Sequence, residues 1–458
     1  MIDKLRLCIS TQTPFIRFNM PYEGLLDRYD DLGDTVELDK LTEGKDYNYT
    51  PGGVTAMVFP LLRRLVKSGV IKDPVWVSLG PNAPPRVVVD EITLQHVTIP
   101  ENDMSPYTVF KEGIWKEIHG LGQLQFKSKE YKAYLSYNWI CACCMLDLRE
   151  KTDLYFIHDF QQLPMGNLLS SVAPTVFQWH IPFQLETVTE RLRTFIVKSI
   201  EGFDSIIVST RRDLEGLIHA GYRGRAYQVY PYIEEDKWSK VSERKIKATQ
   251  EKFGLDSDDE VVLVVGRMDE VKSQDIIIRA ASKIIKRHPH LKIVLVGNGS
   301  FTGSQIGGLA HPKAITWKSR LESLATRLKI RKHVIFTGHI YDGDLGRFYS
   351  LAKTVVVPSR VEGFNLTTVE GWLHKKPVIV SSGAGSSELV NDQVNGYTFN
   401  SGDIDDLAAK LGVILSKHEE SEQMGVNGFD SAKQCFVEVA VNKLQDIFKE
   451  SIDHYKTH

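Results

Sequence analysis

One stretch decides the fold that we predict, TVVVPSRVEGFNLTTVE, which spans Thr354–Glu370. It opens with a continuous β-branched run, Thr354–Val357, as in strands that are covered on both faces. Gly363 then permits a tight turn with a close approach of the backbone. A helix is expected to begin near Leu366 or Thr367. A buried strand that leads directly into a helix is the repeating unit of a parallel α/β sheet.

The same alternation of short apolar strands and helix-like runs extends through both halves of the chain. In the second half the predicted strands are Val261–Val265, Lys292–Val296, Val334–Phe336, Thr354–Val357 and Val378–Val380. In the first half they are Leu5–Ser10, Val75–Leu79, Leu154–Ile157, Thr175–Trp179 and Ser205–Val208. Each half is therefore expected to be a Rossmann-like sheet, which binds ligands beyond the carboxyl ends of its strands.

The boundary between the two halves is expected between Tyr230 and Asp259, because Lys237–Lys252 is charged and lacks a strand pattern. We place an amino-terminal domain at residues 1–235 and a second domain at residues 236–436. The final stretch, Val437–Tyr455, alternates apolar and charged residues at helical spacing. It predicts a C-terminal helix over residues 437–458.

Composition indicates an ordinary globular protein. The chain has 458 residues and a formal net charge of -2, so no nucleic-acid partner is expected. No apolar run reaches the roughly 20 residues that span a bilayer, and no secretory signal opens the chain, so we expect a cytoplasmic protein without a membrane span. Cys141, Cys143 and Cys144 lie in an apolar stretch of helical length, and we interpret them as core residues rather than metal ligands.

Two glutamates in the deciding stretch, Glu362 and Glu370, are candidate ligand-binding residues. The free backbone amides of the helix between them would face the carboxyl edge of the sheet, an arrangement that binds phosphate. The two carboxylates could then hold hydroxyls on opposite sides of a bound diphosphate. Taken alone, the pair would be only a solvated glutamate and an acid at a helix N-terminus.

The first βα loop of the second half favours the ligand-binding role of the two glutamates over the structural one. Gly266 ends the strand, and the cations Arg267 and Lys272 follow within six residues. Arginine can clamp a phosphate with two hydrogen bonds, and lysine acts as a point charge. The alternative is a pair of ordinary surface cations. After another predicted strand, the backbone of His339 and Ile340 could meet a flat base.

These motifs, together with Gly383–Glu388, resemble the donor-binding half of retaining GT-B glycosyltransferases. The resemblance implies two Rossmann-like domains facing across a cleft, a C-terminal helix crossing back to the first domain, and neither metal nor cofactor. It implies that Arg267 and Lys272 neutralise the diphosphate, Glu362 holds the hexose and Glu370 holds the ribose. The remaining donor-binding residues that it implies are Gly266, His339, Ile340, Gly363, Phe364, Asn365, Leu366 and Thr367.

Three stretches of the first half resemble trehalose-phosphate synthases and related trehalose-forming enzymes: Pro51–Val54, Phe156–Phe160 and Trp179–Phe183. By that resemblance Gly52 and Gly53 touch the donor, Asp159 binds the acceptor or hexose, and His180 contacts the transferred sugar. Simpler roles exist for each residue type: a turn for the glycines, a helix cap for the aspartate and core packing for the histidine. Tyr107–Trp115 resembles the aromatic acceptor segment of those enzymes more loosely.

The sequence differs from that family at two places that bear on the chemical class of the acceptor. Those synthases end their first strand with an Asn-Arg pair, whereas no arginine appears here until Arg17. Their Asp-Gly-Met-Asn is replaced by Glu362–Asn365. We therefore expect a neutral sugar acceptor, such as glucose giving trehalose, and UDP-, ADP- or GDP-glucose as donor.

Other readings stay open at this stage. They are a transferase that uses a sugar phosphate or another small polyol, a disaccharide phosphorylase, a nucleotide-sugar epimerase and a non-catalytic sensor. The sequence also leaves the oligomeric state open, with a homo-oligomer among the options. No Asp-x-Asp pair looks placed for a metal, since Asp256 and Asp258 precede a strand and Asp342 and Asp344 open a predicted helix.

Overall fold

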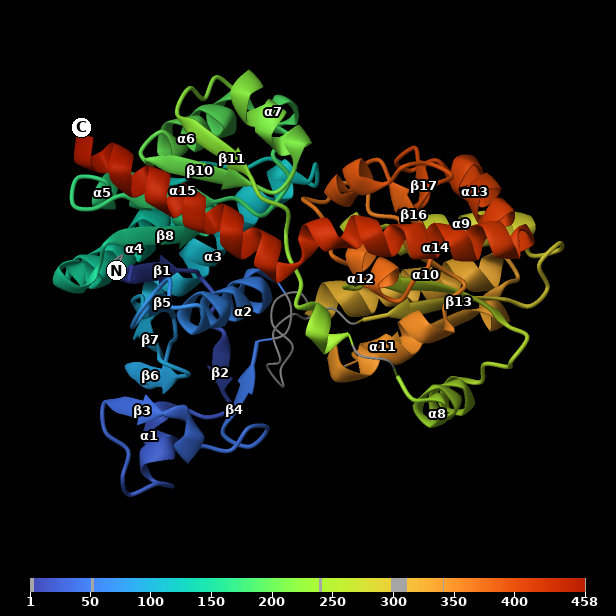
Figure 1. Cartoon of the computed structure of the whole chain (residues 1–458), viewed down its shortest axis with the longest axis horizontal. Coiled ribbons are helices and arrows are strands. Elements are labelled where there is room, and N and C mark those ends of the chain that lie inside the picture. Colours follow the sequence, from blue (N-terminus) through green and yellow to red (C-terminus); the bar gives the residue numbers. More distant parts are fainter. Residues whose placement is uncertain (1–3, 51–52, 239–240, 298–310, 341, 458) are drawn as a thin grey trace. The chain divides into compact units, whose positions relative to one another are not determined.

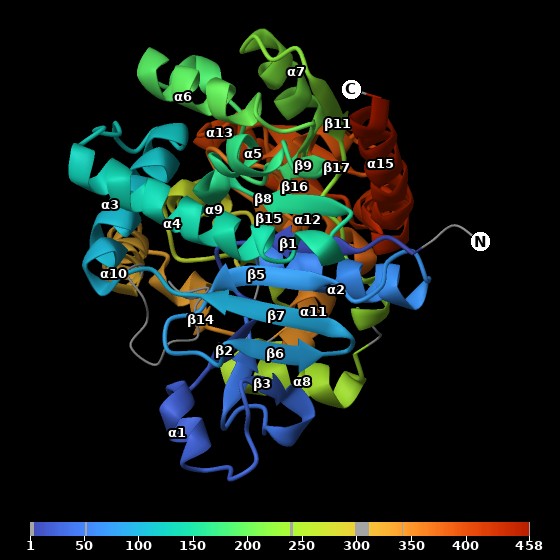
Figure 2. The same cartoon turned by 90° about the vertical axis from the view of Figure 1, so that its left-hand side faces the viewer.

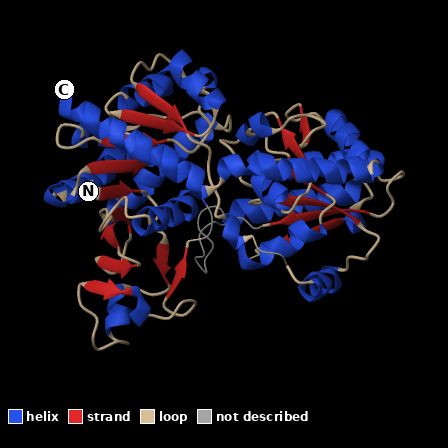
Figure 3. Ribbon diagram, in the orientation of Figure 1, coloured by secondary structure: helices blue, strands red, loops and turns tan. Residues whose placement is uncertain are grey.

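The computed structural model describes residues 4–50, 53–238, 241–297, 311–340 and 342–457. The chain forms two compact units (Figure 1). Unit 1 comprises Met1–Tyr230 and Glu438–His458, and unit 2 comprises Pro231–Val437. Strands lie at the centre of each unit with helices outside them (Figure 3).

Unit 1 is built on a sheet with the strand order β11-β10-β9-β8-β1-β5-β7-β6-β3. The strands of unit 1 are β1 Leu7–Ser10, β2 Ile16–Phe18, β3 Thr35–Glu37, β4 Tyr47–Tyr49, β5 Val75–Leu79, β6 Arg86–Val89, β7 Ile92–Val97, β8 Leu154–His158, β9 Thr175–Gln178, β10 Ser205–Val208 and β11 Arg225–Gln228. Its helices are α1 Tyr22–Leu26, α2 Gly53–Lys67, α3 Glu101–Ile118, α4 Ser128–Leu146, α5 Met165–Leu169, α6 Glu190–Ile200, α7 Arg211–His219 and α15 Val437–Thr457. The strands predicted for the first half are all present, with ends shifted by at most two residues.

The centre of this sheet is parallel, so its carboxyl ends share one edge. β1 pairs in parallel with β5 and β8, and β9 follows beyond β8. β1, β8 and β9 are buried along their whole length, which explains their largely apolar sequence. Figure 2 shows β5, β7 and β6 side by side at the other end of the sheet.

Sequence analysis missed the antiparallel hairpin β6–β7. Its turn is Asp90-Glu91, and both residues have positive φ, 47° and 68°. Two-residue hairpins favour such turns, but Asn-Gly or Asp-Gly is their usual signal. A turn made without glycine therefore left no mark in the sequence. Helix α6 begins at Glu190, because the Thr189 side chain accepts from the Leu192 N–H and caps the helix.

Unit 2 is built on a parallel sheet with the order β14-β13-β12-β15-β16-β17. Its strands are β12 Glu260–Val265, β13 Leu291–Val296, β14 Val334–Gly338, β15 Thr354–Val357, β16 Val378–Ser381 and β17 Gly396–Phe399. Its helices are α8 Glu243–Phe253, α9 Gln274–Ile284, α10 His311–Arg327, α11 Asp342–Leu351, α12 Thr367–Leu373, α13 Ile404–Ser416 and α14 His418–Ala432. All five strands predicted for this half are confirmed, and only the edge strand β17 was missed.

The C-terminal helix α15 packs within unit 1 after the chain has passed through unit 2. Phe448 stacks edge-on against Phe156 of β8 at 5.1 Å between ring centres. Ser451 shares a hydrogen bond of 2.8 Å with Ser205 of β10. The helix therefore closes one face of the sheet in unit 1, where Figure 2 places it beside β11.

The cysteine cluster divides into two kinds of position on α4. Cys141 is fully buried in the core, as predicted, whereas Cys143 and Cys144 are only half-buried, which corrects the prediction for them. All three are free thiols. Within the described ranges, none of the helices has both the length and the apolar character needed to cross a bilayer.

Candidate functional site

The stretch that decided the fold forms a strand, a loop and a helix in unit 2. β15 leads into a loop, and α12 begins at Thr367, as predicted. Asn365 has a φ of +86°, in the left-handed region, and its side-chain oxygen accepts from the Thr367 N–H at 3.0 Å. This bond satisfies one of the free amides at the helix N-terminus. The start of α12 is therefore held by its own loop, at the carboxyl edge of the sheet.

The loop after β12 meets that loop. The Arg360 N–H donates to the Val271 carbonyl at 3.1 Å. Lys272 Nζ lies 2.5 Å from Glu362 Oε2, and these side chains are 13% and 22% exposed. A predicted phosphate-binding cation and a predicted hexose-binding carboxylate thus form one ion pair. Arg267 stands in the same loop, 22% exposed, with Nη1 3.7 Å from Asp269 Oδ2.

Glu370 is held from a neighbouring helix. It lies in the first turn of α12, and its carboxylate accepts a hydrogen bond from the hydroxyl of Tyr349 in α11. The ring of Tyr349 stacks on His374 with 5.1 Å between ring centres. The aromatic contact fixes the hydroxyl, and the hydroxyl fixes one oxygen of the carboxylate. No sequence pattern marked Tyr349 as a partner of Glu370.

The remaining donor-binding candidates lie at the same edge of unit 2. Gly266 ends β12, and the Gly297 N–H donates to the Gly338 carbonyl at 3.0 Å, next to His339. A Cβ on Gly297 would lie 2.1 Å from the Gly266 oxygen, so these loops are tightly packed. His339 is exposed and Ile340 is half-buried. Gly363 and Phe364 are buried, and Leu366 and Thr367 start α12.

The stretch Gly383–Glu388 supports the Glu362 loop. The Glu362 N–H donates to the Gly383 carbonyl at 3.0 Å, and the Ser386 N–H donates to the Phe364 carbonyl at 2.9 Å. The hydroxyls of Ser386 and Thr368 lie 2.8 Å apart. This turn therefore sets the position of the Glu362 backbone.

Replacing Gly383 with alanine is expected to displace that loop. A Cβ there would lie 1.8 Å from the Arg360 oxygen. Relief of such overpacking typically costs about 1–3 kcal/mol. We expect a lower melting temperature and reduced turnover. Gly412→Ala in α13 is the control, since a Cβ there meets nothing within 4 Å. Equal behaviour of the two variants would show that the contact with Arg360 is unimportant.

In unit 1, Asp159 and His180 lie together at the carboxyl edge of adjacent strands. Asp159 directly follows β8, and its Oδ1 accepts from the His180 N–H at 3.3 Å. Asp159 has a φ of +71° and is only 7% exposed. Although it precedes a short 3-10 turn, its side chain makes no capping hydrogen bond there. Burial raises the pKa of Asp159 to about 7, against the backbone hydrogen bonds that favour its charged form.

Sequence analysis missed the histidine partner of His180. His158 Nδ1 lies 3.0 Å from His180 Nε2, and the two rings stack at 21°. Burial lowers the pKa of His180 to about 3 and lowers the pKa of His158 as well. Both imidazoles are therefore neutral near pH 7, and one donates to the other. His158 pairs with Gln178 of β9, and His180 lies two residues after Gln178. Side chains two residues apart in an extended chain share a face, so this spacing could have indicated the pair.

The glycine pair predicted before α2 is described only in part. Gly52 lies outside the described residues. Gly53 opens α2 with a φ of +69°, a conformation that glycine adopts without strain. Just upstream, the Thr50 N–H donates to the Phe15 carbonyl at 2.9 Å. This bond holds the start of α2 against the loop that follows β1.

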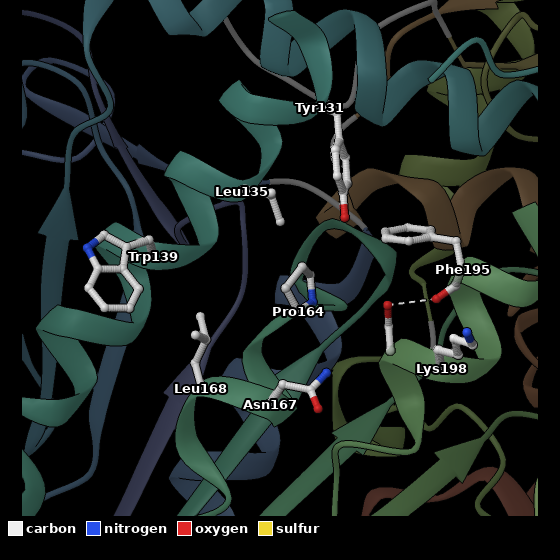
Figure 4. A pocket seen from close by; sticks show the side chains of 9 residues that line it. Tyr131, Leu135, Trp139, Pro164, Asn167, Leu168, Phe195 and Lys198 are labelled. Atoms are coloured by element: carbon white, nitrogen blue, oxygen red, sulfur yellow. Dashed lines mark hydrogen bonds between the residues drawn. The ribbon is translucent and has the colours of Figure 1, made fainter. Parts of the chain in front are cut away.

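A hollow of about 520 Å³ lies on the outer helices of unit 1 (Figure 4). It is lined by Tyr131, Leu135, Trp139, Pro164, Asn167, Leu168, Phe195, Lys198 and Ser199. The predicted site residues are not among these. Within the part of the chain that the structure describes, His, Cys, Asp and Glu side chains form no group of three or more that could hold a metal ion.

Solved structures with this arrangement of two Rossmann-like sheets have the GT-B fold. Trehalose-6-phosphate synthase OtsA superposes with a TM-score of 0.74 over 98% of this chain and 99% of that chain, at 16% identity. HepE from Anabaena, in complex with UDP and glucose, superposes with a TM-score of 0.68 over 98% of this chain and 100% of that chain, at 18% identity. The fold of this chain is therefore GT-B.

The sequence itself matches two family models. "Glycosyl transferases group 1" matches residues 245–430, and "Trehalose synthase, N-terminal domain" matches residues 95–214. The chain thus contains a group 1 glycosyltransferase domain in unit 2 and a trehalose-synthase N-terminal domain in unit 1.

Among curated relatives, D-inositol 3-phosphate glycosyltransferase 2 of Catenulispora acidiphila is 28% identical over 56% of this chain and 58% of its own length. D-inositol 3-phosphate glycosyltransferase of Mycobacterium sp. strain JLS is 31% identical over 48% of this chain and 46% of its own length. The chain therefore spans about half the length of the curated relatives it matches.

Proposed function

We propose that this protein is a retaining hexosyltransferase that moves glucose from a nucleotide sugar to a hydroxyl of a small sugar acceptor. The observation that carries the proposal is the loop pair of unit 2. It pairs Lys272 with Glu362 in the loop that leads into α12, and Arg267 lies in the same loop as Lys272. Fixed cations next to free helix amides suit a departing diphosphate, because they stabilise charge that develops as the glycosidic bond breaks.

In this mechanism the Lys272–Glu362 pair is the resting arrangement. A bound diphosphate gives Lys272 a second negative partner, and Glu362 then accepts hydroxyls of the hexose. Arg267 clamps phosphate oxygens with two parallel hydrogen bonds. Glu370, already oriented by Tyr349, accepts from the ribose hydroxyls. Each step uses a residue whose position is fixed by a contact within unit 2.

Unit 1 supplies polar groups for the sugars. Asp159 and His180 offer a carboxyl group and a neutral imidazole at one sheet edge. We assign hydroxyls of the acceptor to them. Retention of configuration is proposed to follow front-side attack, in which the leaving phosphate takes the acceptor proton. The acceptor is either neutral glucose, giving trehalose, or a phosphorylated sugar, as the names of the inositol-phosphate and trehalose-phosphate relatives suggest.

The test is a panel of UDP-, ADP- and GDP-glucose, each incubated with and without candidate acceptors. A transferase releases nucleoside diphosphate in step with disaccharide formation, and the product keeps the α configuration. Product formed from glucose 1-phosphate without any nucleotide would indicate a phosphorylase. Saturable binding without release of diphosphate would indicate a sensor. Either result contradicts the proposal.

Activity is expected to survive removal of divalent metal. Arg267 and Lys272 provide the positive charge that a metal ion supplies in other sites. Turnover after treatment with EDTA should therefore stay within about twofold of the untreated value, and added Mg²⁺ or Mn²⁺ should not raise it. A loss of about 10-fold or more that Mg²⁺ restores would show that the two cations are insufficient.

A further inference from the structure

Two cations of unit 1 lie where the loop after β1 meets α3. Lys111 of α3 donates from Nζ to Gln12 Oε1 at 3.4 Å and lies 5.5 Å from the centre of the Tyr107 ring. Gln12 lies in the loop between β1 and β2, and Arg17 lies on β2, which follows that loop. Both cationic side chains belong to half-buried residues. Neither was a predicted site residue.

These cations have no anionic partner among the described residues. Neither Arg17 nor Lys111 has a carboxylate oxygen within the 4 Å of an ion pair, and Arg17 Nε is buried without a hydrogen-bond partner. The hydroxyl of Tyr107, beside Lys111, is likewise buried without a partner. Glu112 attracts Lys111 electrostatically, and Glu112 forms an ion pair with Lys116 at 3.8 Å.

Such an arrangement is costly in the free protein. Burial lowers the pKa of Lys111, and the positive charge of Arg17 lowers it further, against the attraction of Glu112. Burial also lowers the pKa of Arg17. Removing a charge from water without a partner is unfavourable, and two like charges near each other add repulsion. A bound anion would relieve both effects.

The position of the pair connects it with the sugar-binding groups of unit 1. β1 and β8 are adjacent parallel strands, with Ser10 beside Ile157. Gln12 follows the end of β1, and Asp159 follows the end of β8, so both lie at the carboxyl edge of the sheet. Lys111, which is bonded to Gln12, therefore stands at the edge that already carries Asp159 and His180, and Arg17 lies close enough for its positive charge to lower the pKa of Lys111.

We propose that Arg17 and Lys111 bind an anionic group of the acceptor, a phosphate monoester. This inference rests on the proposed function and narrows its acceptor. A guanidinium matches two phosphate oxygens in its own plane, and an ammonium adds a point charge. The sequence favoured a neutral acceptor because no arginine directly follows the first strand. That reasoning gave no weight to Arg17 on β2, and it did not include Lys111 of α3.

The test compares glucose, glucose 6-phosphate and glucuronate as acceptors with UDP-glucose as donor. Lys111→Met and Arg17→Gln are compared with the wild type, and Lys116→Met, on the same helix, is the control. We expect the wild type to prefer glucose 6-phosphate. In each variant the ratio of kcat/KM for glucose 6-phosphate to kcat/KM for glucose should fall by about 10–100-fold. This is the effect expected from the loss of one charge-assisted hydrogen bond. The control should keep the preference.

A second readout separates binding from folding. Inorganic phosphate should raise the melting temperature of the wild type and of Lys116→Met, but not that of Lys111→Met. Without phosphate, Lys111→Met should melt no lower than the wild type, because it removes an unpaired charge. A lower melting temperature, or an unchanged acceptor preference, overturns the inference.

The outcomes also separate the two proposals. If glucose is transferred but glucose 6-phosphate is not preferred, the acceptor inference fails and the proposed function stands. Preference for glucuronate would replace phosphate with carboxylate and also contradict the inference as stated. If no acceptor is glucosylated from any donor, the proposed function fails.

Discussion

Replacing Arg267 with alanine is expected to lower turnover by about 10²–10³-fold, the usual cost of removing one group that stabilises developing charge. The fold should survive, because the Arg267–Asp269 pair spans 3.7 Å at a partly exposed position. Such pairs typically contribute about 0–1 kcal/mol to stability. The measurement is steady-state release of nucleoside diphosphate at saturating donor, together with thermal melting.

Arg279→Ala is the matched control for this substitution. Arg279 lies on α9, just beyond the same loop, and its Nε is 3.6 Å from Asp275 Oδ2. The substitution Arg279→Ala removes the same type of side chain and a comparable ion pair, and it leaves the loops around Glu362 unchanged. Turnover close to that of the wild type is expected. If Arg267→Ala and Arg279→Ala are equally active, Arg267 has no role in the departure of the diphosphate.

Sequence reasoning succeeded in unit 2 because local signals and tertiary structure agree there. The strand before Pro358 is β-branched, and Gly363 and Asn365 mark the turn that leads into α12. Burial on both faces makes such strands continuous apolar runs, so their ends are easy to recognise. The residues of that loop could thus be named before their contacts with Lys272 were known.

The partners that sequence reasoning missed come from elements distant in the chain. Tyr349 of α11 donates to Glu370 of α12. Gly383 supports Glu362 through a backbone hydrogen bond, which does not depend on the type of side chain. Lys111 reaches Gln12 across 99 residues. These contacts depend on how elements pack, and a pattern read along the chain does not contain that information. The same holds for the approach of His158 to His180.

Two aspartates at opposite ends of β8 give the prediction with the most distinctive pH dependence. Asp159 follows the strand and is buried away from any cation in the described residues, and burial raises its pKa from 3.8 to about 7. Asp153 precedes the strand and bonds to Arg6, with 2.5 Å between Arg6 Nη2 and Asp153 Oδ1. Burial alone would raise the pKa of Asp153, but the hydrogen bonds and charge of Arg6 outweigh it and lower that pKa.

Asp159→Asn is expected to stabilise the protein and lower its activity. Between pH 4 and pH 7 the unfolded wild type loses this proton while the folded wild type keeps it, so folding becomes less favourable as the pH rises. Asparagine has no such proton to keep. The free energy of unfolding of the variant should therefore match that of the wild type near pH 4 or below. Its advantage should grow up to about pH 7 and then level off, at no more than about 4 kcal/mol.

Asp153→Asn should behave in the opposite way. It removes an ionised partner of Arg6, so it should destabilise the protein at neutral pH and do so less as the pH falls through the lowered pKa of Asp153. Denaturant melts of both variants and the wild type from above pH 7 to below pH 4, where Asp153 also titrates, provide the comparison. Asp159→Asn should also lower kcat/KM by about 10–100-fold, because the sugar loses a hydrogen bond to a carboxylate. A gain in stability that does not vary with pH would show that Asp159 is ionised in the folded protein, and its burial would then need a cationic partner.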